Sequence, residues 1–165
     1  MGTRGLTAVI LDGERKIAQY GQWDHYPSGQ GKTALAFCRD VLANDAKREA
    51  FVAALGRCRF SNDDDDKVAE SWGTSFQEVF PAWAREHGAG ILRFVENHPH
   101  AGEIVLQDEW AFGADSLFCE WGYVIDLDGN ALEGYDSREE LFHLRDFAGD
   151  EELLFLRVLL LELAG

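Results

Sequence analysis

Residues 117–135 have the sequence LFCEWGYVIDLDGNALEGY, and they carry the clearest β-hairpin signal of the chain. Leu117 to Leu127 is rich in aromatic and β-branched residues, which favour the half-buried surface of a strand. Asp128-Gly129 is a turn dipeptide, because both residue types adopt the positive backbone angles of a tight hairpin turn. Asn130 to Tyr135 then supplies the returning strand.

The beginning of the chain has a similar arrangement. Leu6 to Leu11 is an apolar, β-rich run, Asp12-Gly13 is again a turn dipeptide, and Lys16 to Gln22 alternates loosely between polar and apolar residues. The likeness between the two regions is too short to indicate a duplicated half. We expect two β-hairpins that share one antiparallel sheet.

Apolar residues recur at helical spacing in the middle and at the end of the chain. We expect helices at residues 33–43, from Asn44 or Asp45 to near Gly56, at 67–72, 76–86, 91–96 and 151–164, and extended segments at 57–60 and 103–106. Pro81 should kink or divide the helix that contains it. The last helix, Glu151 to Ala164, is apolar around nearly its whole circumference, which favours packing on the sheet, with a homodimer interface through this C-terminal helix as the alternative.

These elements predict one α+β domain, residues 1–165, in which an antiparallel sheet from two hairpins is covered by helices. A chain of 165 residues with 46% hydrophobic composition can bury a core without disulfides or a structural metal. The three cysteines, Cys38, Cys58 and Cys119, are odd in number and lack Cys-x-x-Cys spacing, so we expect reduced, buried thiols.

The chain is strongly acidic, with a net charge of −15. Direct nucleic-acid binding draws on Lys and Arg, so this charge argues against it; it suits a solvated surface, a basic protein partner, or mimicry of nucleic acid. The sequence has no signal-peptide pattern and no apolar run of 18 residues or more. We therefore expect a cytoplasmic protein without membrane association.

A loop from Tyr20 to Gly31 gathers aromatic, ionisable and turn-forming residues between the first hairpin and the first helix. Within it, Trp23-Asp24-His25-Tyr26 combines a carboxylate, an imidazole and aromatic faces, a mixture that binds small polar ligands or moves protons. The alternative is structural: Asp24 caps the turn while Trp23 and Tyr26 pack inward.

The same loop continues into Ser28-Gly29-Gln30-Gly31-Lys32-Thr33, which ends in Gly-Lys-Thr. A phosphate-binding P-loop needs a further Gly at the position of Tyr26, so this assignment fails. A weaker anion site at the start of the helix remains open, because free backbone amides attract anions there.

Metal sites are not indicated. His98, His100 and Glu103 lie close in sequence, but the two histidines lack a diagnostic spacing and we interpret them as part of an exposed turn. Asp126, Asp128 and Asn130 imitate the start of a calcium loop whose later positions do not match, which leaves the hairpin interpretation. We expect neither a metal nor a cofactor.

Three motifs resemble a group of small uncharacterised proteins of bacteria and their phages. They are Gly2-Thr3-Arg4-Gly5-Leu6, the loop motif YGQWDxYPSGxG from Tyr20, and EWxYVIDLD from Glu120. The resemblance covers both ends of the domain and implies a shared architecture and an association with mobile elements. It implies no catalytic residue.

A more distant likeness is to N-terminal nucleophile hydrolases, whose chains open with a nucleophile on a strand, a turn and a second strand. Those enzymes use the free amine of the first residue to activate the nucleophile, whereas Thr3 here would lie behind Gly2. Because of this difference, an amide hydrolase that uses Thr3, Asp24 or His25 is an alternative and not the leading interpretation.

We expect a non-catalytic binding or accessory protein, encoded by a phage or mobile element, that captures a small polar ligand or a host protein. A second alternative is an acidic inhibitor that mimics nucleic acid toward a DNA- or RNA-binding protein. The candidate ligand-binding residues are Arg4, Trp23, Asp24, His25, Tyr26, Ser28 and Lys32. No residue is assigned a catalytic role.

Overall fold

The computed structural model of the chain describes residues 2–98, 102–115, 118–136 and 154–159. Five strands form one sheet in the order β2-β1-β5-β6-β7. Their bounds are Gly5–Leu11 for β1, Glu14–Gly21 for β2, Trp121–Asp126 for β5, Ala131–Asp136 for β6 and Leu154–Leu159 for β7. This confirms the α+β class and the two predicted hairpins.

The two hairpins join in the middle of the sheet. Within each hairpin the strands are antiparallel, but β1 and β5 run parallel, with Gly5 opposite Trp121 and Ile10 opposite Asp126. The sheet is therefore mostly, not wholly, antiparallel. An alternating apolar pattern predicts which face of a strand is buried, but it does not specify the direction of a distant neighbour.

The two Asp-Gly turns lie together at one end of the sheet. Asp12 and Gly13 have φ angles of 55° and 72°, as a tight hairpin turn requires. The Asp128 carboxylate accepts hydrogen bonds from the amides of Asp12, at 2.7 Å, and Gly13, at 2.8 Å. The second turn thus holds the first, and this contact is a link that sequence reasoning did not predict.

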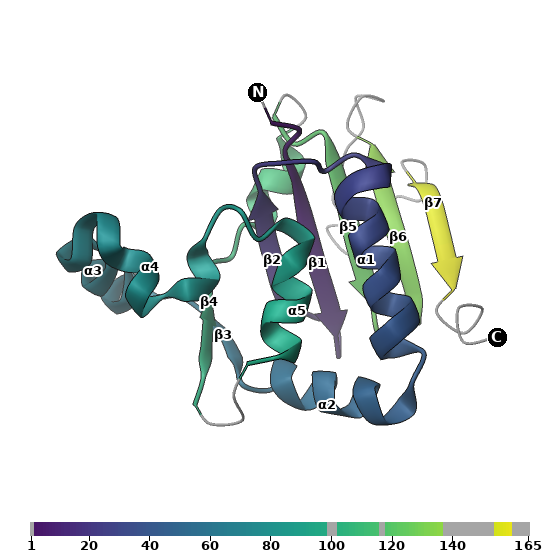
Figure 1. Cartoon of the computed structure of the whole chain (residues 1–165), viewed down its shortest axis with the longest axis horizontal. Coiled ribbons are helices and arrows are strands. Elements are labelled where there is room, and N and C mark those ends of the chain that lie inside the picture. Colours follow the sequence, from purple (N-terminus) through teal and green to yellow (C-terminus); the bar gives the residue numbers. More distant parts are fainter. Residues whose placement is uncertain (1, 99–101, 116–117, 137–153, 160–165) are drawn as a thin grey trace.

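Helices and short segments connect the hairpins, and Figure 1 shows α1 and α5 over one face of the sheet while α3 and α4 project away from it. The helices are α1 Lys32–Phe37, α2 Asp45–Leu55, α3 Asp63–Trp72, α4 Phe76–Val79 and α5 Ile91–Glu96. The short strands β3 Cys58–Phe60 and β4 Ile104–Leu106 pair in parallel, as a second sheet. Further helical turns are η1 Pro27–Gly31, η2 Cys38–Leu42, η3 Gly73–Ser75, η4 Pro81–Trp83, η5 Gly88–Gly90 and η6 Trp110–Ala114.

Several local predictions are confirmed. Asn44 caps α2 by accepting a hydrogen bond from the Lys47 amide at 3.0 Å, and α5 matches its predicted range. The helix expected at 67–72 begins earlier than predicted, at Asp63, because Asn62 caps it and its first turn favours the carboxylates of residues 63–66. One of these carboxylates, Asp65, pairs with Arg59 at 2.6 Å.

Two predicted helices are corrected. The helix expected at 76–86 ends at Val79, and Pro81 begins a separate turn, because proline has no backbone N–H with which to continue the hydrogen bonds of a preceding helix. The helix expected at 151–164 is wrong over Leu154–Leu159, which forms β7; the rest of that range lies outside the described residues. A run that is apolar on all sides has no periodicity to distinguish a helix from a buried strand, and pairing with β6 decided the outcome.

Both faces of the sheet are covered by apolar side chains. The main core lies between the sheet and the helices and includes Val9, Phe37, Phe51, Ile91 and Ile125. A smaller cluster on the opposite face contains Leu6, Ala8, Ile10, Cys119, Val124 and Tyr135, with Trp110 and Phe112 of η6 packed against it. The three cysteines are free, as expected, and Cys58 is only half-buried.

Candidate functional site

Within the predicted loop, His25 is buried, whereas the neighbouring residues Asp24 and Tyr26 are exposed. The His25 side chain is 0% exposed. Its ring lies between Gly5 and Gly21, where a Cβ on either glycine would collide with it. On the sheet side, His25 Nε2 is 3.4 Å from Thr7 Oγ1, and the Tyr123 hydroxyl donates a hydrogen bond to the His25 carbonyl at 2.7 Å.

This environment keeps His25 neutral. Burial lowers the pKa of His25 to about 4, and the backbone of Trp23 only partly opposes this effect. The other ring nitrogen, Nδ1, is buried and has no hydrogen-bond partner within the described part of the chain. A ring with no exposed surface cannot contact a ligand in this conformation, so the geometry supports a structural role for His25.

Trp23, Asp24 and Tyr26 lie at the surface. The side chains of Trp23 and Tyr26 are 50% and 40% exposed. Asp24 has a φ of 57°, and its carbonyl accepts a hydrogen bond from the Gln30 amide at 2.7 Å, so it shapes the turn. The Tyr26 hydroxyl donates to the Asp24 carboxylate at 3.2 Å, and this contact raises the pKa of Tyr26.

The remaining predicted residues lie on neighbouring elements. Ser28 lies in η1 and Lys32 opens α1, and both are exposed. Arg4, just before β1, is the only one of the seven predicted residues among the described residues that line a pocket along β2. The segment that carries Arg4 lies beside the loop, because the His25 amide donates to the Thr3 carbonyl at 3.0 Å, but the Arg4 guanidinium itself lies over the Phe118 ring in the pocket.

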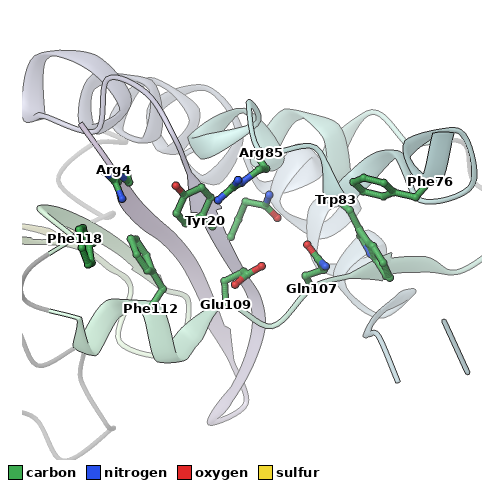
Figure 2. A pocket seen from close by; sticks show the side chains of 10 residues that line it. Arg4, Tyr20, Phe76, Trp83, Arg85, Gln107, Glu109, Phe112 and Phe118 are labelled. Atoms are coloured by element: carbon green, nitrogen blue, oxygen red, sulfur yellow. The ribbon is translucent and has the colours of Figure 1, made fainter. Parts of the chain in front are cut away.

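The pocket has a volume of about 610 Å³, which is in the range of small-ligand sites. Figure 2 shows that it extends from Arg4 and Phe118 at one end to Trp83 and Phe76 at the other. Its lining residues are Arg4, Gln19, Tyr20, Phe76, Trp83, Arg85, Gln107, Glu109, Phe112 and Phe118. Aromatic surfaces thus alternate with amide and charged groups, so the pocket suits an amphipathic or polar ligand.

The pocket follows the outer edge of β2, the first strand of the sheet order. Gln19 and Tyr20 are consecutive residues of β2, and consecutive side chains in a strand point to opposite faces. Because both side chains line the pocket, the pocket must extend around the edge of β2 from one face of the sheet to the other. The segments that carry Arg85 and Glu109 form its walls, since the Gln22 amide donates to the Arg85 carbonyl at 3.3 Å and the Glu109 amide donates to the Ala18 carbonyl at 2.9 Å.

Two guanidinium groups are held on aromatic rings in this pocket. Arg4 lies 5.0 Å from the ring centroid of Phe118, and Arg85 lies 4.9 Å from that of Tyr20. Within the described residues, neither guanidinium forms a hydrogen bond or an ion pair. Both therefore keep donors available, positioned by stacking rather than by a protein carboxylate.

One carboxylate also lines the pocket. Burial raises the pKa of Glu109, while the charge of Arg85 opposes the shift and that of Asp108 adds to it. The lining thus holds two cations and one anion, a balance that favours a ligand with a net negative charge in an otherwise acidic protein.

We compared the chain with protein-family models, curated proteins and solved structures. None of the three matches it.

Most pocket residues were not predicted from the sequence. Arg85, Glu109, Phe112 and Phe118 come from segments that follow the first hairpin by more than sixty residues, and the fold brings them to its edge. Their sequence signal is weak. Arg85 follows the aromatic residues Phe80 and Trp83 closely, and arginines near aromatic residues are common both in cores and at surfaces. Tyr20 was quoted as the first residue of the loop but was not chosen as a site residue.

The described residues show neither a metal-binding cluster nor a membrane-spanning helix. No group of three His, Cys, Asp or Glu side chains among them is arranged to hold a metal ion, and His100 lies outside that part of the chain. Within the same residues, no helix has the length and apolar character needed to cross a bilayer.

Proposed function

We propose that the protein is a non-catalytic binding protein that captures a small carboxylate-bearing ligand in the pocket along β2. The observation that supports this most is the pair of guanidinium groups, Arg4 and Arg85, that line the pocket without a carboxylate partner among the described residues. Guanidinium groups bind carboxylates with two parallel hydrogen bonds, and aromatic stacking presents their planar faces in a defined orientation.

The polar lining adds selectivity to this charge attraction. Gln19 and Gln107 offer amide donors and acceptors, and Phe112 and Trp83 offer apolar surface for the uncharged part of the ligand. The Gln19 side chain is itself oriented by a hydrogen bond of 3.5 Å to the Ala84 carbonyl. In this proposal Arg4 remains a ligand-binding residue, as the sequence predicted, whereas the buried His25 packs against the sheet and has a structural role.

The binding test uses succinate, glutamate and citrate as probes, with isothermal titration calorimetry at low salt. We expect at least one of them to bind the wild-type chain and to bind about tenfold more weakly to Arg85→Ala and to Arg4→Ala, because each loses a charged hydrogen-bond donor. Arg85→Lys keeps the charge but loses the planar guanidinium group, so its affinity for the probe should lie between that of the wild type and that of Arg85→Ala.

The matched control is Arg39→Ala, which removes an exposed arginine outside this pocket. It should retain wild-type affinity. Binding of none of the three probes to the wild-type chain, or equal weakening by Arg39→Ala and Arg85→Ala, would overturn the proposal, because general charge rather than the pocket would then control affinity.

A further inference from the structure

The outer edge of β2 is partly covered and partly open. In an antiparallel pair, the backbone groups of every second residue point away from the partner strand. Ala18 accepts a hydrogen bond from the Glu109 amide, and Gln22 donates one to the Arg85 carbonyl, so both of these residues direct backbone groups away from β1. Tyr20 lies midway between Ala18 and Gln22 and pairs with Leu6 of β1 in regular register. Its backbone N–H and C=O therefore also point away from β1.

The backbone of Tyr20 is the open position. Among the described residues, neither its N–H nor its C=O has a hydrogen-bond partner outside the sheet, although its side-chain hydroxyl donates to Gln22 at 2.5 Å. Edge strands are normally covered or blocked, because unpaired backbone groups attract other extended chains. Here the cover is interrupted where the pocket lies, between the walls formed by the segments of Arg85 and Glu109.

We propose that the natural occupant of the pocket is a short extended peptide segment that bears a carboxylate and adds to the edge of β2 at Tyr20. This inference rests on the proposed carboxylate-binding function and specifies its ligand. One peptide residue would donate its N–H to the Tyr20 carbonyl and accept from the Tyr20 N–H, the two bonds of an added strand. Its carboxylate would bind Arg4 or Arg85, each stacked on an aromatic ring at the pocket.

The lining fits this occupant better than it fits a compact metabolite. A strand advances about 3.3 Å per residue and alternates its side chains, so a peptide on this edge presents them in turn to the two faces around which the pocket lies. Trp83 and Phe76 at one end supply apolar contacts, and the arginines supply the charge. Because the cover resumes at Ala18 and Gln22, only one peptide residue can pair fully with the backbone.

The test uses a synthetic peptide, acetyl-Thr-Val-Thr-Val-Glu with a free C-terminus, whose residues favour an extended chain. Its affinity is compared with that of succinate and with those of variants that are N-methylated at one peptide bond each. We expect the parent peptide to bind more tightly than succinate, and methylation at one position to weaken binding about five- to tenfold, since it removes one backbone hydrogen bond. Methylation of the adjacent residues should have little effect, because their N–H groups point away from β2.

A protein variant provides a second test. Tyr20→Pro removes the outward N–H, and proline is tolerated at a strand edge when its nitrogen faces away from the partner. Tyr20→Ala removes the ring but keeps the N–H, so it is the matched control. We expect Tyr20→Pro to bind the peptide about fivefold more weakly than Tyr20→Ala, with circular dichroism confirming that both are folded.

The outcomes separate the two proposals. If succinate, glutamate or citrate binds through Arg85 but the peptide binds no more tightly and no methylated position matters, the pocket takes a small carboxylate and the peptide inference fails. If neither those probes nor the peptide binds, the proposed function itself fails.

Discussion

His25 is a titratable residue that the fold buries completely. Its neutral ring is enclosed by two strand glycines and by Thr7, and its protonation would place a charge at a position that has no exposed surface and, among the described residues, no carboxylate hydrogen-bonded to it. The histidine of the predicted loop thus contributes to holding the loop against the sheet rather than to binding at the surface.

The first prediction concerns the pH dependence of stability. In the unfolded chain the pKa of His25 is 6.5, and in the folded chain it is about 4, so the unfolded state binds more protons between these values. The stabilisation is complete above pH 6.5 and is lost as the pH falls toward 4, by about 3 kcal/mol in total. Urea unfolding at several pH values should show this slope in the wild type and a reduced slope in His25→Asn.

The control for this prediction is His87→Asn, since the His87 ring is only partly buried and its Nε2 donates a hydrogen bond to the Pro81 carbonyl. Because His87→Asn leaves the buried His25 ring in place, an equal reduction of the slope in both variants would contradict the role of His25. An unchanged slope in His25→Asn would show that other groups account for the acid sensitivity.

The second prediction concerns the glycines around the ring. A Cβ at Gly21 would lie 2.6 Å from His25 Nδ1 and 2.9 Å from the Cα of Gly88, and neither neighbour is the end of a flexible side chain. We expect Gly21→Ala to lower the free energy of unfolding by about 1–3 kcal/mol, the usual cost of overpacking. Gly90→Ala is the control, because no atom lies within 4 Å of its added Cβ. Equal stability of the two variants would show that the cradle can relax.

At the scale of elements, the two hairpin turns act as one unit. The Asp128 carboxylate binds two amides of the other hairpin, and the Leu127 amide donates to the Ile10 carbonyl at 3.0 Å. These hydrogen bonds join the two hairpins at the end of the sheet where the parallel strands β1 and β5 lead into their turns.

The third prediction follows from that link. Asp128→Ala leaves the amides of Asp12 and Gly13 to water, and the site is exposed, so we expect a loss of about 1–2 kcal/mol in the free energy of unfolding. Asp128→Asn retains one acceptor and should lose about half as much. Glu49→Ala, which removes an exposed carboxylate from α2, is the control for the change in charge. A cost for Asp128→Ala no larger than that of Glu49→Ala would contradict the linking role.

At the scale of the whole molecule, a net charge of −15 opposes the compact state. Salt weakens both this repulsion and the surface ion pairs, such as that between Lys47 and Asp40 at 2.7 Å. Exposed ion pairs contribute little to stability, so the relief of repulsion should dominate.

The fourth prediction is therefore that salt stabilises the fold at neutral pH. Raising sodium chloride from roughly 10 to 150 mM shortens the Debye length from about 30 to 8 Å and should increase the urea midpoint of unfolding. Near the isoelectric point of about 4.6 the same change should have little effect. A midpoint that falls with salt at neutral pH would mean that ion pairs outweigh the repulsion.

The sequence by itself determined the local elements of this protein. Turn residues between apolar runs specify the two hairpins, although in the second turn the positive φ lies at Asn130 and not at Asp128 or Gly129. Asn44 specifies the start of α2, and Pro81 specifies the end of the helix before it. These features depend on contacts between residues a few positions apart, and such contacts can be read from spacing alone.

Only the tertiary structure decided how these elements meet. The parallel pairing of β1 with β5, the strand at Leu154–Leu159 and the burial of His25 all depend on partners far away in the chain. The pocket has the same origin, since Arg4 and Arg85 reach it from segments eighty residues apart and no local pattern links them. Local propensity specifies elements because its contacts are near in sequence, whereas a site assembled at the edge of a sheet is specified by packing.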